Sequence, residues 1–115
     1  MKKIALFAFS EDLGVFAHIM MNAIDMKKRG YEAKIIIETK ATRFVKDLMD
    51  EQKPFAGLFK KVKEEGLIEG VCKACSAMTG AQEAAKQQGL RLLDEMNGHP
   101  GIARYLEEGF TILTF

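Results

Sequence analysis

The feature that most limits the fold is the run IALFAF at residues 4–9, in which every side chain is apolar. An amphipathic helix or a half-exposed strand places polar residues at regular intervals, and this run has none. A strand that is apolar at every position is typical of the interior of a parallel sheet, where both faces are covered. We therefore expect an α/β protein whose first element is a central strand.

Strand-like and helical patterns alternate along the rest of the chain. Asp12 is a good N-cap for a helix over 13–29, and a second β-branched run at 31–38 completes a strand–helix–strand unit. Residues 90–93 fit either a short fourth strand or one more turn of helix. Further helices are expected at 39–49, 54–66, 79–89 and 99–109, and further strands at 67–71 and 110–115.

Local residues predict where three of these helices begin. Pro54 suits a first-turn position, and Thr79 with Gln82 suits a capping box. His99, followed by proline, is expected to open the last helix. The alternation as a whole predicts a three-layer α/β sandwich with a mostly parallel sheet of four or five strands.

Length and charge narrow the class of protein. The 115 residues suffice for one core, so we predict a single domain over 1–115. A formal net charge of +1 gives no reason to expect a nucleic-acid or membrane partner. The apolar run at 4–9 is too short for a signal peptide or a membrane span, which predicts a cytoplasmic protein whose two cysteines are thiols.

Parallel sheets place their ligands beyond the carboxyl ends of the strands, where the winding reverses. If the strand order begins 2-1-3, that crevice lies between the loop after the first strand, with Ser10, Glu11 and Asp12, and the loop at 72–78 after the third. Both cysteines of the chain fall in this second loop. The expected crevice is therefore also where the thiol chemistry lies.

Cys72 and Cys75 form a C-x-x-C pair just before an expected helix. The helix N-terminus and the neighbouring Lys73 favour a thiolate, which could hold a sulfur atom as a persulfide. The pair could instead cycle between dithiol and disulfide, supply half of a zinc site, or pack as small apolar residues. We take Cys72 and Cys75 as reactive thiols, with ligand-binding candidates Ser10, Glu11, Lys73 and Ser76.

Zinc is the weakest of these alternatives on the sequence. A structural zinc site takes four ligands, and one C-x-x-C pair supplies two. His18 and His99 are the only histidines. His18 falls on the polar face of the first helix, and His99 is better explained as a neighbour of a helix N-cap. We therefore assign no metal ligand and no cofactor.

Two segments carry a resemblance to a known family. The sequence GVCKAC at 70–75, directly after the third strand, and the ending EEGFTILTF at 107–115 resemble DsrE-like proteins. The resemblance implies a flavodoxin-like fold, assembly into trimers or hexamers, and a carrier that holds sulfur as a cysteine persulfide. Cys72 matches the sulfur-accepting cysteine of the family, whereas Cys75 has no counterpart there and becomes a candidate resolving thiol.

The partners implied are sulfur donors and acceptors, either proteins or small thiols, together with further copies of the chain. The apolar run at 110–115 and the side chains of Phe55 and Phe59 suggest an apolar interface for such an assembly. The alternative function is an oligomeric ligand-binding module, or a redox or metal-binding module, whose C-x-x-C pair transfers no sulfur.

Overall fold

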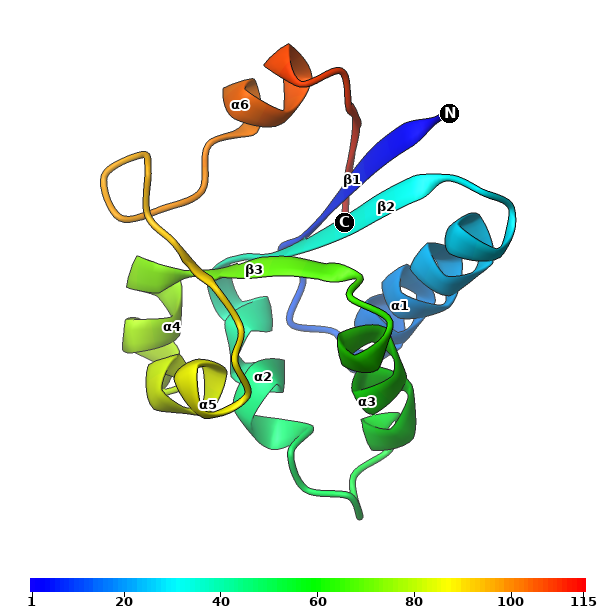
Figure 1. Cartoon of the computed structure of the whole chain (residues 1–115). Helices are drawn as coiled ribbons and strands as arrows, with labels where there is room; N and C mark the ends of the chain where they lie inside the picture. The colour runs from blue at the N-terminus through cyan, green and yellow to red at the C-terminus, as the bar shows by residue number, and fades with distance from the viewer.

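A five-stranded sheet organises the computed structural model, which describes residues 1–115 (Figure 1). All strand pairs are parallel, and the strand order is β4-β3-β2-β1-β5. The predicted α/β class is confirmed, and residues 90–93 contain a short strand rather than a helical turn. The strands are β1 (Lys3–Ala8), β2 (Glu32–Ile37), β3 (Ile68–Cys72), β4 (Leu92–Leu93) and β5 (Thr111–Thr114).

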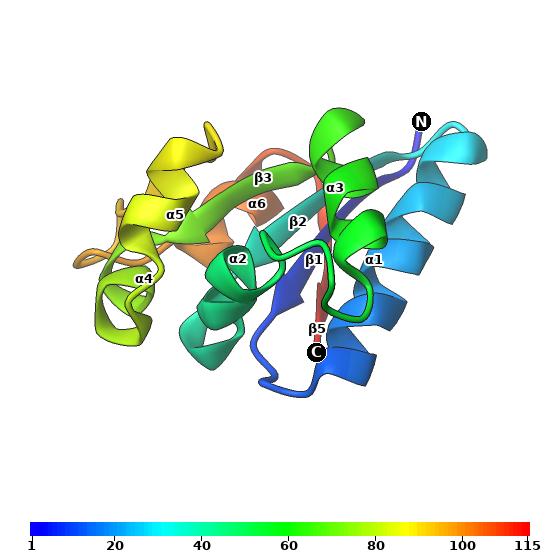
Figure 2. The same ribbon diagram turned by 90° about the horizontal axis from the view of Figure 1, so that it is seen from below.

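The helices cover the two faces of this sheet unequally. Five α-helices, α1 to α5, lie on one face and α6 lies on the other, as the two ribbon views show (Figures 1 and 2). The layers are those of a flavodoxin-like three-layer sandwich. The helices are α1 (Leu13–Lys28), α2 (Arg43–Asp47), α3 (Ala56–Glu64), α4 (Lys73–Thr79), α5 (Gln82–Gln87) and α6 (Ile102–Glu107), with a 3-10 turn η1 (Thr39–Thr42) before α2.

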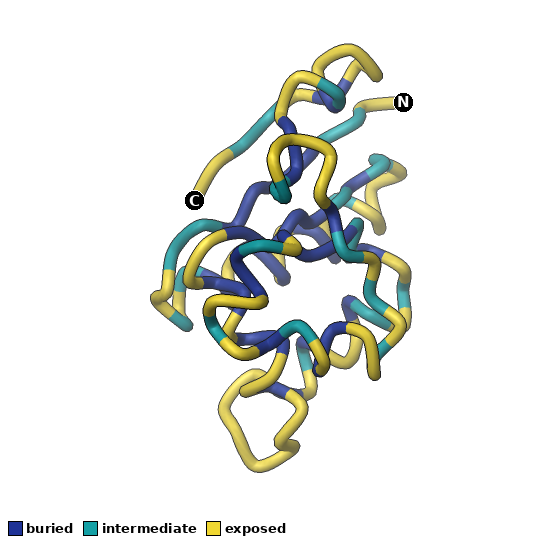
Figure 3. The backbone as a smooth tube through the Cα atoms, turned by 90° about the vertical axis from the view of Figure 1, so that its left-hand side faces the viewer, coloured by how far each residue is buried: buried dark blue, intermediate teal, exposed yellow.

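The core is divided by the sheet into a large and a small part. The larger cluster has 21 buried residues, including Leu6 and Ala8, and the smaller has 6, including Ala5 and Phe7. Alternate side chains of β1 therefore enter opposite clusters, as expected for a strand covered on both faces. Figure 3 shows this buried interior beneath exposed turns.

Several predicted helix boundaries are confirmed and others are wrong. The Asp12 carboxylate accepts a hydrogen bond from Val15 N–H at 3.0 Å and caps α1. By contrast, Pro54 lies in a turn before α3, which begins at Ala56. Thr79 is the last residue of α4 instead of a cap, because the chain enters α4 directly from β3 and leaves it at Gly80, with φ of +77°.

The expected strand order beginning 2-1-3 is wrong. β2 pairs with both β1 and β3, so β1 and β3 are not neighbours. The winding reverses between β1 and β5 instead. The crevice expected between the loops after β1 and β3 is therefore not formed by adjacent strands, and the segment at 72–78 is a helix and its cap rather than a loop.

Part of the expected apolar interface is core. Phe59 and Phe110 are buried, at 0% and 4% exposed. Phe55 and Phe115 are the exposed members, at 45% and 40%. The aromatic residues that suggested an assembly surface thus divide between the interior and the outside.

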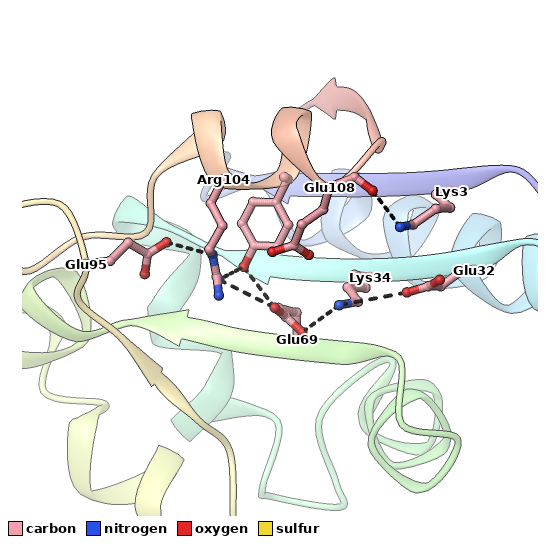
Figure 4. A network of polar contacts seen from close by, with 8 residues as sticks. Lys3, Glu32, Lys34, Glu69, Glu95, Arg104 and Glu108 are labelled. Atoms are coloured by element: carbon pink, nitrogen blue, oxygen red, sulfur yellow. Dashed lines mark hydrogen bonds and ion pairs between the residues drawn. The ribbon is translucent and has the colours of Figure 1, made fainter.

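A polar network fixes α6 on its face of the sheet (Figure 4). Glu69 on β3 accepts a hydrogen bond from the Tyr105 hydroxyl at 3.0 Å and lies 3.5 Å from both Arg104 and Lys34. Glu95 pairs with Arg104 at 3.2 Å and accepts a hydrogen bond from Gly101 N–H at 2.9 Å. The network therefore ties the segment before α6 to the sheet.

None of the helices combines the length and the apolar character that crossing a bilayer requires.

Close packing of β3 against β4 leads to a stability prediction. A Cβ added at Gly70 would lie 2.6 Å from Leu93 Cγ and 2.8 Å from Arg91 O. Gly70→Ala should therefore lower the free energy of unfolding by about 1–3 kcal/mol, as overpacked sites do. Gly57→Ala is the matched control: nothing lies within 4 Å of its Cβ, it is in α3, and it should gain about 0.5–1 kcal/mol. Urea unfolding of both variants measures the difference, and equal stability would contradict the packing argument.

Candidate functional site

Four side chains with metal-ligating or nucleophilic chemistry meet at the carboxyl end of the sheet. They are Glu38, Cys72, Cys75 and His99, and one ligand atom from each lies within 4.8 Å of the others. Glu38 follows β2, the cysteines lie at the junction of β3 and α4, and His99 belongs to the connection between β4 and α6. Three separate connections of the fold thus contribute to one cluster.

The two cysteines are placed by the start of α4. Cys72 is the last residue of β3 and the N-cap of α4, and its Sγ accepts a hydrogen bond from Cys75 N–H at 3.3 Å. The C-x-x-C spacing brings Cys75 back over Cys72 after the first helical turn. Both are free thiols in this structure.

A tight turn delivers His99 to the cysteines. Met96 and His99 exchange two backbone hydrogen bonds of 2.8 and 2.9 Å around Asn97 and Gly98, which have φ of +51° and +88°. Positive φ at both central residues is the type I′ geometry that Asn-Gly favours. Gly98 O also accepts a hydrogen bond from Ala74 N–H at 2.9 Å, which holds the turn against α4.

The sequence suggested that His99 flanks a helix N-cap. In the structure it contacts both sulfurs instead. Its Nδ1 lies 3.1 Å from Cys72 Sγ and 3.5 Å from Cys75 Sγ. The expectation was wrong because α6 begins at Ile102, with Gly101 as its N-cap. The Asn-Gly dipeptide was the available signal for the turn.

Glu38 is the acidic member of the cluster, and sequence reasoning missed it. It is 6% exposed, its N–H donates to Ala8 O at 2.9 Å, and its Oε2 accepts a hydrogen bond from the Cys75 thiol at 3.8 Å. Burial raises the pKa of this carboxyl above its ordinary value. A single glutamate at the end of a strand gives no pattern that would distinguish it from a surface residue.

The electrostatics of Cys72 differ from the expectation. Burial raises the pKa of its thiol to about 12, and the Cys75 side chain and the charge of Glu38 raise it further, whereas the hydrogen bond from Cys75 N–H acts in the opposite direction. Lys73, expected to stabilise a thiolate, has its ammonium 3.6 Å from the Asp94 carboxylate instead. Neither the raised pKa nor the position of Lys73 supports the activated thiolate expected at Cys72.

Of the two thiols, Cys75 is the more accessible. A cavity of about 240 Å³ opens beside it. Cys75 is 8% exposed whereas Cys72 is 0% exposed. A small reagent therefore meets Cys75 first. The cavity is lined by Thr39, Lys40, Cys75, Met78 and Thr79.

None of the four ligand-binding candidates lines this cavity. Glu11 reaches its rim indirectly, because its carboxylate lies 4.0 Å from Lys40 Nζ. Ser10 Oγ accepts a hydrogen bond from Asp12 N–H at 3.0 Å, at the entry to α1. Ser76 is fully buried and its hydroxyl donates to Lys73 O at 2.9 Å. Lys73 lines another cavity, with Asp94.

Comparison with other proteins shows which family the chain belongs to. An uncharacterized protein of Methanocaldococcus jannaschii, MJ0733, is 33% identical over 117 residues, which cover 96% of this chain and 93% of MJ0733. The chain belongs to the same family as MJ0733. An uncharacterized protein of Archaeoglobus fulgidus is 46% identical over 41 residues, 36% of this chain and 67% of that protein.

No family model matches the chain, and no solved structure matches it. Relationship to MJ0733 thus extends over nearly the whole domain and brings no assigned activity with it. The function has to be argued from the cluster itself.

The difference in burial leads to a labelling prediction. In reduced, chelator-treated protein at neutral pH, iodoacetamide should modify Cys75 well before Cys72, because Cys75 lines the cavity and Cys72 is enclosed. Peptide mass spectrometry after timed quenching measures the order. Protein unfolded in guanidinium is the control, in which both thiols should react at similar rates. Faster modification of Cys72 in the folded protein would contradict the geometry.

Proposed function

We propose that the protein is a sulfur carrier that accepts a sulfane sulfur as a cysteine persulfide and passes it on. The observation that supports this most directly is a pair of thiols in which Cys75 opens to a cavity while Cys72 lies behind it. A carrier needs one thiol that a donor can reach. A second thiol within reach can then discharge the sulfur.

Loading is a simple exchange between a thiol and a persulfide. The Cys75 sulfur attacks the outer sulfur of a donor R–S–SH, so that a new S–S bond forms on Cys75 and the donor S–S bond breaks. Cys75 becomes Cys75–S–SH and the donor leaves as R–SH, which takes the thiol proton. His99 Nδ1, 3.5 Å from Cys75 Sγ, can carry that proton.

Discharge can follow two routes that both balance. An acceptor thiol can take the outer sulfur and regenerate the Cys75 thiol. Alternatively, Cys72 can attack the inner sulfur, which forms a Cys72–Cys75 disulfide and releases hydrogen sulfide. The second route needs a small thiol as reductant before the next cycle. We propose this route as the reason that the chain has a pair of cysteines, since the resemblance to DsrE-like proteins accounts for Cys72 alone.

The resemblance of residues 70–75 and 107–115 to DsrE-like proteins supports the same function. That resemblance alone assigned the accepting role to Cys72, and the burial of Cys72 leads us to propose Cys75 instead. We further propose sulfur donor and acceptor proteins or small thiols as partners, and a reducing cytoplasm as the working environment. Assembly into trimers or hexamers stays a prediction, which light scattering tests.

Intact mass spectrometry tests the carrier function. Reduced, chelator-treated protein incubated with inorganic polysulfide should gain one sulfur atom, which a later excess of thiol removes. Cys75→Ser should abolish the gain, because the entry thiol is lost. Cys72→Ser, the matched control, should load and keep its sulfur longer, because the disulfide route is closed.

Two results would contradict this assignment. Undiminished loading of the Cys75→Ser variant would return the accepting role to Cys72. No loading of the wild-type protein, beside a persulfide-forming control protein, would leave the pair without a sulfur-carrying function.

A further inference from the structure

The cluster at the carboxyl end of the sheet collects three anion-forming groups, and His99 is its one member that can carry positive charge. Glu38, Cys72 and Cys75 are all buried. Two lysines lie around the cluster, and each has its ammonium group at the surface beside an exposed carboxylate: Lys40 lies 4.0 Å from Glu11 and Lys73 lies 3.6 Å from Asp94. Glu38 forms no ion pair. Burying these groups in their ionised forms is unfavourable unless something positive binds among them.

We propose that Glu38, Cys72, Cys75 and His99 bind one Zn²⁺ ion. The four ligand atoms would be one carboxylate oxygen, two thiolate sulfurs and Nδ1 of the imidazole. This inference goes beyond the sulfur-carrier proposal and does not depend on it, because it rests on the positions of the four groups alone.

The spacing of the four groups fits a tetrahedral ion. Zinc–sulfur bonds of about 2.3 Å and zinc–nitrogen or zinc–oxygen bonds of about 2.0–2.2 Å require ligand atoms roughly 3.4–3.8 Å apart. The sulfurs lie 3.1 and 3.5 Å from His99 Nδ1, and Cys75 Sγ lies 3.8 Å from Glu38 Oε2. The widest separation among the four is within 4.8 Å, so a movement of about 1 Å closes the site.

The identity of the donors selects the ion. Two thiolates and an imidazole favour a thiophilic ion such as Zn²⁺ over Mg²⁺ or Ca²⁺, which prefer oxygen ligands. Binding displaces the two thiol protons and leaves a divalent cation among three negatively charged groups. Because four protein groups fill a tetrahedral shell, the site has the closed form of a structural zinc centre.

The local backbone already has the form that such a site needs. Cys75 N–H donates to Cys72 Sγ at 3.3 Å, which stabilises a thiolate at that position. The turn carrying His99 is held to α4 through Ala74 N–H and Gly98 O at 2.9 Å. These contacts orient two ligands before any ion arrives, and the cavity beside Cys75 supplies the entry path.

Ion binding and sulfur loading would exclude each other. Both use the lone pairs of the same sulfurs, so a zinc-bound protein offers no free thiol to a persulfide donor. The metal-bound form would therefore be the resting, protected state of the thiols.

Titration of reduced, chelator-treated protein with Co²⁺ and then Zn²⁺ tests the site. Co²⁺ should give thiolate charge-transfer bands in the near ultraviolet and the intense visible bands of tetrahedral coordination at one ion per chain. Zn²⁺ should displace it stoichiometrically, with a Kd below about 1 µM. Native mass spectrometry should then show one zinc per chain.

Matched variants separate the ligands from their surroundings. Glu38→Gln and His99→Asn should each weaken zinc binding at least about 100-fold, since even outer-shell partners of a ligand cost 10–100-fold. Glu107→Gln and His18→Asn change the same residue types at exposed positions away from the cluster and should bind like the wild-type protein. Circular dichroism of each metal-free variant confirms that it is folded.

Three results of the zinc titrations would contradict the proposal, and none of them depends on whether the protein carries sulfur. Absence of a one-to-one complex at micromolar zinc, or equal loss from His99→Asn and His18→Asn, would overturn the site. Unchanged binding by a folded Glu38→Gln variant would overturn the four-ligand assignment. Because sulfur loading is measured on metal-free protein and zinc binding on sulfur-free protein, failure of one leaves the other standing.

Discussion

Parallel strands can be joined only by crossovers, and those crossovers are right-handed. From β1 to β4 the chain advances across the sheet in one direction, so every helix from α1 to α5 falls on the same face. Only the last crossover returns past β1 to β5, and this reversal places α6 alone on the other face. The same progression sets the ends of β2, β3 and β4 side by side, which is what brings the four side chains of the cluster together.

Much of the fold could be predicted because its signals are local. The uninterrupted apolar run of β1 and the cap at Asp12 each depend on neighbouring residues alone. Strand order could not be predicted in this way, because β1 and β2 are similarly apolar and either could have paired with β3. Thr79 illustrates a related limit: a hydroxyl suited to capping α5 instead ends α4 and forms a hydrogen bond with Thr42 at 2.7 Å.

The candidate site shows the same division between local and long-range information. The cysteine pair was visible as a motif, and its position at the end of β3 was correctly placed. Glu38 and His99 were not visible, since each joins the cysteines only through strand order and the turn after β4. The turn itself was encoded locally, in Asn97-Gly98, but its docking on α4 was not. Burial of Cys72 likewise follows from packing and reverses the acidity expected from its sequence neighbours.

Because β4 is short, the cluster affects how easily this edge of the sheet unfolds locally. β4 has two residues and pairs only with β3, so the chain beyond it is held to the sheet by few main-chain hydrogen bonds. Glu38 and Cys75 are 37 positions apart, and Cys75 and His99 are 24 apart. An ion shared by these residues would act as a cross-link that closes two consecutive loops, restricting the unfolded chain as a disulfide does. Local unfolding at β4 would then require His99 to leave the ion. Opening of this edge would thus be coupled to the residues that follow β2 and β3 in the middle of the sheet.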